Sequence, residues 1–139
     1  MDSAGTWSMN GKGCGYNKTC SPTYPVRGVC PQGWHLLTRA EFEALFTAVG
    51  GQSTAGQKLK SATGWAAYSG ITNEDAFAFS ALPAGFWGLN GDYDNKGNNA
   101  YFWSSTEDDS DFAYYMRLNY SLGSSFLDYD YKDYGFSVH

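Results

Sequence analysis

Positive charge is scarce in this chain, and long apolar runs are absent. Nine Lys and Arg residues stand against 14 Asp and Glu among 139 residues, which gives a formal net charge of −5 at pH 7. Because binding to nucleic-acid phosphates depends on clustered Lys and Arg, we expect no DNA or RNA partner. No apolar run approaches the roughly 20 residues that cross a bilayer, so we expect no membrane insertion of this domain.

Cysteine is also scarce, and all three cysteines lie in the first 30 residues. Cys14 and Cys20 are close enough in sequence to bridge a short loop, and in an oxidising compartment we expect a disulfide; two free thiols are the alternative. Cys30 is left over, and an odd cysteine in a secreted domain suggests a partner outside this sequence. A zinc site would need a fourth ligand, and neither His35 nor His139 has finger-like spacing.

An export signal is missing as well, since Met1-Asp2-Ser3 does not begin a signal peptide. Either the protein is cytoplasmic, or the chain is a domain of a longer secreted protein whose signal lies upstream. The composition favours the second, because 18% aromatic residues with 11 Tyr and 17 Gly are typical of extracellular binding domains. We therefore predict an extracellular or cell-surface location.

A single domain over residues 1–139 is predicted, because 42% hydrophobic composition supports one core at this length. Residues 1–29 hold several Gly and two Pro with no apolar periodicity, which predicts a loop-rich lead-in. Residues 30–139 are predicted to form the core of the domain.

A capped amphipathic helix is the strongest local signal. Thr38 and Glu41 have the spacing of a capping box, in which each side chain accepts a hydrogen bond from a backbone N–H at the helix start. Four apolar residues at i, i+3, i+4 and i+7 form one stripe that can face a core: Phe42, Leu45, Phe46 and Val49. Gly50 and Gly51 end this helix.

The middle of the chain has weaker signals. Residues 54–62 allow a short second helix, ended by Gly64. Residues 75–87 fit a short strand or a turn, with three apolar residues that can be buried: Phe77, Phe79 and Leu82. Residues 90–99 predict a polar loop, because Asn, Asp and Gly accept turn conformations. A central strand is predicted over residues 100–106.

Two alternating segments, residues 112–120 and 125–131, predict antiparallel strands joined by a turn at residues 122–124. One face of these strands carries Tyr114, Met116, Leu118, Leu127, Tyr129 and Tyr131. The other face carries Tyr115, Arg117, Asn119, Phe126, Asp128 and Asp130. Since antiparallel sheets commonly bury one face, we expect the first set in the core and the second set in water, with Tyr114 and Tyr120 at the margins of the outward face. Phe136 and Val138 are expected to close the sheet.

Six short motifs occur in order along the chain: Val29-Cys-Pro-Gln-Gly-Trp-His-Leu, Lys58-Leu-Lys-Ser, Gly64-Trp65, Phe79-Ser-Ala-Leu-Pro-Ala-Gly, Tyr101-Phe-Trp-Ser-Ser-Thr and Tyr134-Gly-Phe-Ser-Val. Together they resemble the Fibrobacter succinogenes major paralogous domain over nearly the whole chain. That family is similar to a branch of the C-type lectin-like superfamily. The resemblance implies an α+β fold, with two helices packed on a twisted antiparallel sheet and long loops.

The chain departs from this family at both ends. Family members usually begin upstream of Met1 and continue the final Gly-Phe-Ser-Val into a short tail with a Cys, whereas this chain ends at His139. The resemblance therefore implies a domain trimmed from a longer chain, in which Cys30 has lost its usual partner. The superfamily's calcium-dependent sugar binders use Glu-Pro-Asn or Gln-Pro-Asp and Trp-Asn-Asp motifs. Neither is present, and Trp103-Ser104-Ser105 stands where the latter is expected, so calcium-bridged sugar binding is not carried over.

The polar loop holds the best metal candidate. Calcium prefers clusters of hard oxygen ligands, and the loop offers four side chains of this kind: Asp92, Asp94, Asn95 and Asn98. Trp103 stands where a closing carboxylate would be needed, so a metal-free turn is the favoured alternative. Asp108, Asp109 and Asp111 are open to the same two interpretations, a second cation site or a solvated turn.

The sequence offers little support for a catalytic site. Paired carboxylates for glycoside hydrolysis require one acid whose pKa is raised in an apolar pocket, and no such pocket is identified. A Ser-His-Asp set would have to use His35, for which a structural hydrogen-bonding role is favoured. Superfamily members that make formylglycine use a pair of cysteines late in the domain sequence, whereas the three cysteines here all lie in its first 30 residues. We therefore expect that the protein is not an enzyme.

The expected function is a non-enzymatic ligand-binding module of a bacterial surface or secreted protein. Tyr with Asn, Asp and Ser is the composition of adaptable binding surfaces, so we expect a protein or carbohydrate ligand on the outward face of the C-terminal sheet. The predicted ligand-binding residues are Tyr115, Arg117, Asn119, Phe126, Asp128 and Asp130. Superfamily relatives include retroelement-diversified receptors that vary on this sheet, so a diversified adhesin is one form of this prediction. The alternative is a structural or assembly module of a surface lipoprotein without its own soluble ligand.

Overall fold

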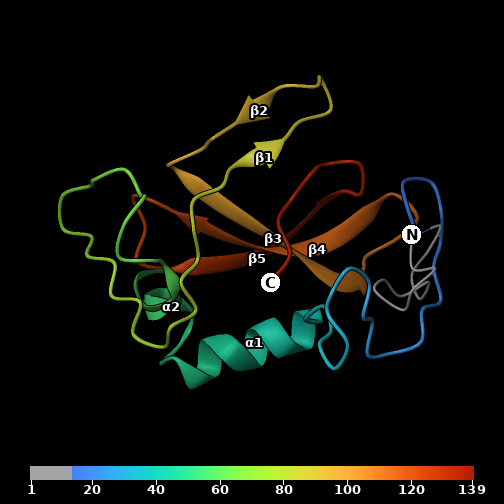
Figure 1. Cartoon of the computed structure of the whole chain (residues 1–139), viewed down its shortest axis with the longest axis horizontal. Helices are drawn as coiled ribbons and strands as arrows, with labels where there is room; N and C mark the ends of the chain where they lie inside the picture. Colours follow the sequence, from blue (N-terminus) through green and yellow to red (C-terminus); the bar gives the residue numbers. More distant parts are fainter. Residues whose placement is uncertain (1–13) are drawn as a thin grey trace.

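A computed structural model describes residues 14–139 and shows an α+β architecture. Residues 1–13, the first part of the predicted lead-in, lie outside the described residues. Two helices are present in the described part, α1 (Arg39–Ala48) and α2 (Gln52–Leu59). The strands are β1 (Phe86–Trp87), β2 (Tyr93–Asp94), β3 (Asn99–Glu107), β4 (Phe112–Asn119) and β5 (Ser125–Tyr131). In Figure 1, α1 lies along one side of the β3–β5 sheet, and the β1–β2 hairpin lies on the other side.

The predicted capping box starts α1. Thr38 Oγ1 accepts a hydrogen bond from the Glu41 backbone N–H, and the Glu41 carboxylate accepts one from the Thr38 N–H at 2.7 Å. Such a cap contributes about 1 kcal/mol to helix stability. Phe42, Phe46 and Val49 are buried as the apolar stripe predicts, and Leu45 packs at the edge of the core.

The second helix is shifted from its predicted position. It begins at Gln52, directly after Gly51, and it ends at Leu59. Gly51 makes this close succession of helices feasible, because its φ of 106° is accessible to glycine and costly for other residues. The helix ends early because Lys60 is extended and forms a parallel bridge with Ala81. Within the described chain, neither helix is long and apolar enough to span a membrane.

The main sheet is antiparallel, with strand order β3-β4-β5. The two predicted C-terminal strands are confirmed as β4 and β5. The strand that we expected at the centre is β3, but β4 is the middle strand. Within residues 14–139, the outer edge of β3 pairs only through single bridges, from Ala100 to Gly85 and from Phe102 to Ser137. β3 is therefore flanked on that side by short returning segments instead of by a full strand.

The core lies between α1, α2 and one face of this sheet, which we call the helix face. The register places Ala100 opposite Leu118 and Phe102 opposite Met116 on this face, and all four are buried. Together with the two helices they form a single hydrophobic cluster. In the part of β4 that the helices cover, the alternation of the sequence therefore predicted the core side chains correctly.

The segment before β1 differs from the expectation. Phe77 and Leu82 are exposed, at 55% and 61%, although the sequence allowed both to be buried. Ala78 and Ser80 have positive φ values of 54° and 52°, so this segment does not alternate like a strand. As a result, Phe79 packs against the core and Ala81 is buried.

A buried lysine connects α2 to the β4–β5 turn. Lys60 is fully buried, and its Nζ donates hydrogen bonds to the Asn119 and Leu122 carbonyl oxygens, each at 2.9 Å. The ammonium also lies 5.2 Å from the centroid of the Trp65 ring. Burial lowers the pKa of Lys60 to about 8, because desolvation disfavours its charged form. The Lys58-Leu-Lys-Ser motif is therefore a structural element of the core.

Candidate functional site

The predicted ligand-binding residues share the face of the sheet opposite the helices, which we call the outer face. The β4–β5 register pairs Tyr115 with Asp128 and Arg117 with Phe126. Asp130 lies further along the same face, opposite Ala113. Directly opposed residues of antiparallel strands have neighbouring side chains on one face, so these residues are brought together as expected.

This face is only partly open to water. Tyr115 is 5% exposed, so the expectation that it faces solvent is wrong. Its ring contacts Tyr101, Trp103 and Phe136, with centroid distances of 5.8, 6.2 and 4.9 Å. Phe136 comes from the segment after β5, which returns across the sheet and pairs beside β3 through Ser137. The burial raises the pKa of Tyr115 to about 12.

Arg117 is the central polar group on the open part of this face. Its guanidinium lies 5.8 Å from the Phe126 ring centroid. Within residues 14–139 its side chain makes no hydrogen bond or ion pair, and its Nε is buried without a partner. Of its three nitrogens only Nε is buried without a partner among the described residues, so the terminal N–H groups are left to meet an acceptor group from outside.

Two carboxylates and an amide complete the predicted set. Asp128 is exposed, whereas burial raises the pKa of the half-buried Asp130, with a smaller contribution from the Asp128 charge. Asn119 differs from the others, because its side chain donates to Asn99 Oδ1 and accepts from Ser121. Its amide therefore organises the β4–β5 turn.

The four predicted metal ligands lie in and after the β1–β2 hairpin. Asp92 accepts a hydrogen bond from the Asn90 side chain, and Asn95, with a φ of 61°, accepts one from the Asn98 backbone N–H. Among residues 14–139 there is no group of three or more His, Cys, Asp or Glu side chains placed to hold a metal ion. A site made of Asp92, Asp94, Asn95 and Asn98 would use two carboxylates and two amides, so calcium here stays a prediction.

The acidic residues after β3 organise a turn. Asp109 Oδ1 accepts hydrogen bonds from the Asp111 and Phe112 backbone N–H groups. Asp108 Oδ1 accepts one from the Tyr114 hydroxyl at 2.6 Å. These bonds favour the solvated turn over the second cation site.

A row of aromatic rings lies on the helix face, where we had expected core; three of the rings are exposed, whereas Phe112 and Tyr114 are half-buried. We call it the tyrosine strip, and its members are Tyr16, Phe112, Tyr114, Tyr129 and Tyr131. Tyr129 and Tyr131 are 51% and 37% exposed, so their predicted burial is wrong. The alternation of β4 and β5 continues unchanged past the part of the sheet that the helices cover, and alternation alone does not show where that cover stops.

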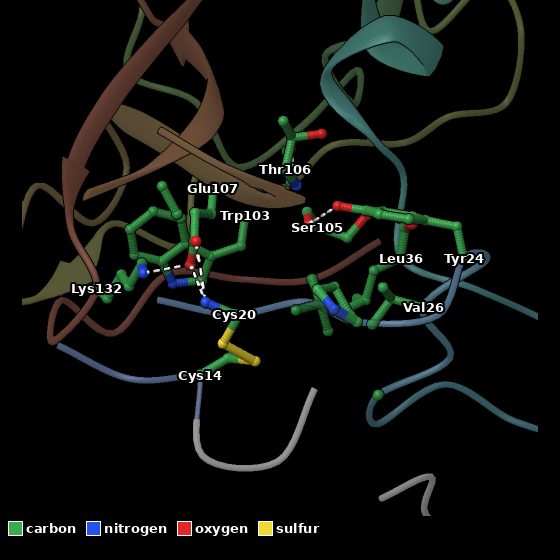
Figure 2. Close-up of a pocket in the computed structure, with 15 residues that line it drawn as sticks. Cys14, Cys20, Tyr24, Val26, Leu36, Trp103, Ser105, Thr106, Glu107 and Lys132 are labelled. Carbon is green, nitrogen blue, oxygen red and sulfur yellow. Dashed lines mark hydrogen bonds and ion pairs between the residues drawn. A yellow bond between two sulfur atoms is a disulfide. The ribbon is translucent and has the colours of Figure 1, made fainter. Parts of the chain in front are cut away.

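The predicted Cys14–Cys20 disulfide is present, and it closes a loop that docks on the sheet. Cys20 N donates to Glu107 Oε1 at 3.0 Å, and Lys18 N donates to the Ser110 carbonyl. Lys132 Nζ donates to Glu107 Oε2 (Figure 2), and it also donates to Lys18 O and Ser110 O, so all three ammonium hydrogens are used. A disulfide indicates a non-cytoplasmic environment.

A cavity of about 430 Å³ lies between this loop and β3 (Figure 2). Its walls include apolar side chains and the disulfide: Val26, Leu36, Trp103, Val138, Cys14 and Cys20. The Glu107–Lys132 pair forms its charged edge, and its ammonium is already fully hydrogen-bonded. The cavity therefore suits an apolar group more than a charged one.

The remaining ionisable candidates have structural surroundings. Cys30 is a free, buried thiol, and burial raises its pKa. His35 Nε2 lies 2.9 Å from Glu41 Oε1, which confirms the hydrogen-bonded role favoured for His35. That bond joins the histidine to the capping box of α1.

Comparison with known proteins identifies the family. No curated protein and no solved structure matches the chain. The model of the Fibrobacter succinogenes major domain family matches residues 5–139, which is nearly the whole sequence. This span includes all six motifs that carried the resemblance and both of the surfaces described above. The chain therefore belongs to the Fibrobacter succinogenes major domain family.

Proposed function

We propose that the chain is a non-enzymatic ligand-binding module of a bacterial surface or secreted protein, and that the open part of its outer face contacts the ligand. The observation that carries this proposal is the Arg117 side chain, which has a buried Nε and no hydrogen-bond or ion-pair partner among residues 14–139. Buried polar groups normally have partners, and an isolated guanidinium beside an aromatic ring is a common anchor in binding interfaces.

The ligand is a protein or a carbohydrate with an acceptor group that meets Arg117. Carbonyl, carboxylate and hydroxyl oxygens all accept hydrogen bonds from a guanidinium. Phe126 offers an apolar surface beside it, and Asp128 offers an exposed acceptor for ligand hydroxyl or amide donors. Tyr115 supports this surface from below through its contacts with Trp103 and Phe136.

The finer fold assignment is part of this proposal. Two helices on one face of an antiparallel sheet, followed by long loops, are consistent with a C-type lectin-like fold. A location outside the cytoplasm agrees with the disulfide. The outer face lies on two regular strands, so substitutions at Arg117, Phe126 and Asp128 change the surface with little change to the core, as a diversified adhesin would require.

The test is a binding screen with a triple variant. The chain and Arg117→Ala/Phe126→Ala/Asp128→Ala are applied to a glycan array and to a panel of bacterial and host surface proteins. We expect at least a tenfold loss of binding in the variant with a melting temperature within a few degrees of the parent. Trp34→Ala is the matched control, since Trp34 is an exposed aromatic side chain on a different part of the molecule.

Two results would count against this proposal. Retained binding in the triple variant would exclude the outer face as the contact surface. Absence of any ligand for the parent chain would favour the alternative, a structural or assembly module of a surface lipoprotein.

A further inference from the structure

The tyrosine strip is a continuous row of rings that crosses two strands and reaches the disulfide loop. Tyr114 and Tyr129 are cross-strand partners with ring centroids 6.0 Å apart, and Phe112 and Tyr131 form the next pair at 4.5 Å. Phe112 also contacts Tyr129 at 5.7 Å, and Tyr16 contacts Tyr131 at 5.9 Å. These exposed and half-buried rings therefore form one surface on the opposite face of the sheet from Arg117.

Carboxylates without cationic partners surround this row. Asp108 accepts a hydrogen bond from the Tyr114 hydroxyl, and this bond raises the pKa of Tyr114. The charge of Asp111, and to a lesser extent that of Asp133, raises the pKa of Tyr16. Within residues 14–139, no Lys, Arg or His forms an ion pair with Asp108, Asp111 or Asp133. The tyrosine strip therefore combines aromatic rings and negative charge on one surface.

One end of the strip already holds a cation. The Arg39 guanidinium lies 4.4 Å from the centroid of the Tyr114 ring, the same ring whose hydroxyl binds Asp108. A cation over an aromatic face is attracted by the ring quadrupole, and a nearby carboxylate strengthens that attraction. Tyr129 and Tyr131 offer further rings of the same kind, and both are exposed.

We propose that the tyrosine strip is a docking surface for a cationic peptide segment, whose Arg or Lys side chains lie over the rings of Tyr129 and Tyr131 and pair with the surrounding aspartates. Charge complementarity selects this occupant. An anionic ligand would be repelled by Asp108, Asp111 and Asp133. A neutral sugar would stack on the rings but would leave these carboxylates without a counter-charge.

This inference does not rest on the proposed function of the outer face. The tyrosine strip and Arg117 lie on opposite faces of β4 and β5, so ligands at the two surfaces do not compete for the same side chains. Substitutions at one surface can therefore be scored separately from substitutions at the other. Loss of one binding activity would leave the other unchanged.

The experiment measures fluorescence anisotropy of a labelled eight-residue peptide of alternating Gly and Arg, titrated with the whole chain at low salt. An alternating Gly and Ser peptide of the same length is the uncharged probe. We expect saturable binding of the Arg peptide, at least tenfold weaker binding of the Ser peptide, and weakening of Arg-peptide binding as salt rises. Tyr129→Ala/Tyr131→Ala and, separately, Asp111→Asn/Asp133→Asn should each weaken binding about tenfold.

Control variants make the outcome decisive. Trp34→Ala and Arg117→Ala should bind the Arg peptide like the parent chain, and all variants should melt within a few degrees of it. Equal binding of the Ser peptide would overturn the proposal, as would unchanged binding in the Tyr129/Tyr131 variant. Displacement of the Arg peptide by a neutral oligosaccharide such as cellohexaose would also overturn it, and would assign the strip to sugars.

Discussion

Lys132 Nζ lies 2.6 Å from Glu107 Oε2 and joins the residue after β5 to the end of β3. Both side chains are largely withdrawn from water, at 5% and 21% exposure. The same two side chains bind the backbone of the disulfide loop, through Lys18 O and Cys20 N. This pair therefore holds the loop, with its Tyr16 ring, against the sheet.

Replacing Lys132 should be costly for stability. Lys132→Met leaves the Glu107 carboxylate without its cation in a mostly buried site, and removing one partner of a buried pair typically costs about 3 kcal/mol. Urea unfolding of the two proteins measures this loss. Glu43→Ala is the matched control, because the Arg39–Glu43 pair is exposed and should contribute less than about 0.5 kcal/mol. Equal effects of the two substitutions would show that the Lys132 pair is not a structural clamp.

Lys60 should make stability depend on pH. Its pKa is about 8 in the folded chain and 10.5 ordinarily, so between these values the unfolded chain binds more protons. Stability should therefore rise as pH increases from about 8 to 10.5, by up to about 1.4 kcal/mol for each unit of pKa difference. Denaturant unfolding at pH 7.5 and 9.5 tests this, and Lys60→Met should remove the rise.

Tyr115 should make stability fall as pH rises, which is the opposite of the effect of Lys60 and occurs at higher pH. Tyr115 has a pKa of about 12 in the folded chain against an ordinary value of 10, so its contribution to stability is lost as pH rises from 10 to 12. The measurement for Lys60 should therefore stop below pH 10. The same slope in the parent and in Lys60→Met between pH 7.5 and 9.5 would contradict the assignment to Lys60.

Gly56 should not tolerate a methyl group, although it lies in a helix. A Cβ at this position would lie 2.3 Å from the Ser124 carbonyl oxygen, because α2 packs directly on the β4–β5 turn. Alanine would gain about 1 kcal/mol of helix propensity, but the clash should exceed it and leave Gly56→Ala about 1–2 kcal/mol less stable. Gly15→Ala is the control, since no atom of the described residues lies within 4 Å of the position that its Cβ would take. A more stable Gly56→Ala protein would show that the turn can move away from the helix.

The calcium assignment predicts a shift in thermal unfolding. Binding to the folded state alone raises the melting temperature, so millimolar calcium should stabilise the chain, and a chelator should reverse the effect. Asp92→Asn/Asp94→Asn should abolish the shift, whereas Asp108→Asn should retain it. No shift in the parent chain would identify residues 92–98 as a metal-free turn.

Local chemistry allowed much of the fold to be predicted. The Thr38 and Glu41 capping box and the apolar stripe of α1 depend on residues a few positions apart, so their geometry follows from the order of the residues. The alternation of β4 and β5 and the Cys14–Cys20 bridge were predictable for the same reason. Each of these features needs contacts within a short stretch of chain.

The boundaries of the candidate surfaces were not predictable in this way. Tyr115 and Tyr129 both follow a strict two-residue alternation, yet the first is buried and the second is exposed. Their exposure depends on which distant segments cover the sheet: Phe136 returns over the outer face, and α1 covers only part of the helix face. The many aromatic residues in both strands indicated that other segments would pack on the sheet, but they did not indicate where.

The sequence by itself determined the helix cap, the strand faces, the disulfide and the family, because these depend on neighbours in the chain or on ordered motifs. Only the tertiary structure decided which part of each sheet face meets water. It left the Arg117 guanidinium unpaired within the described residues, and it placed Tyr16 beside Tyr131 across more than 100 residues. The physical reason is that burial is a property of the assembled layers, so an identical alternation becomes core or surface according to what packs upon it.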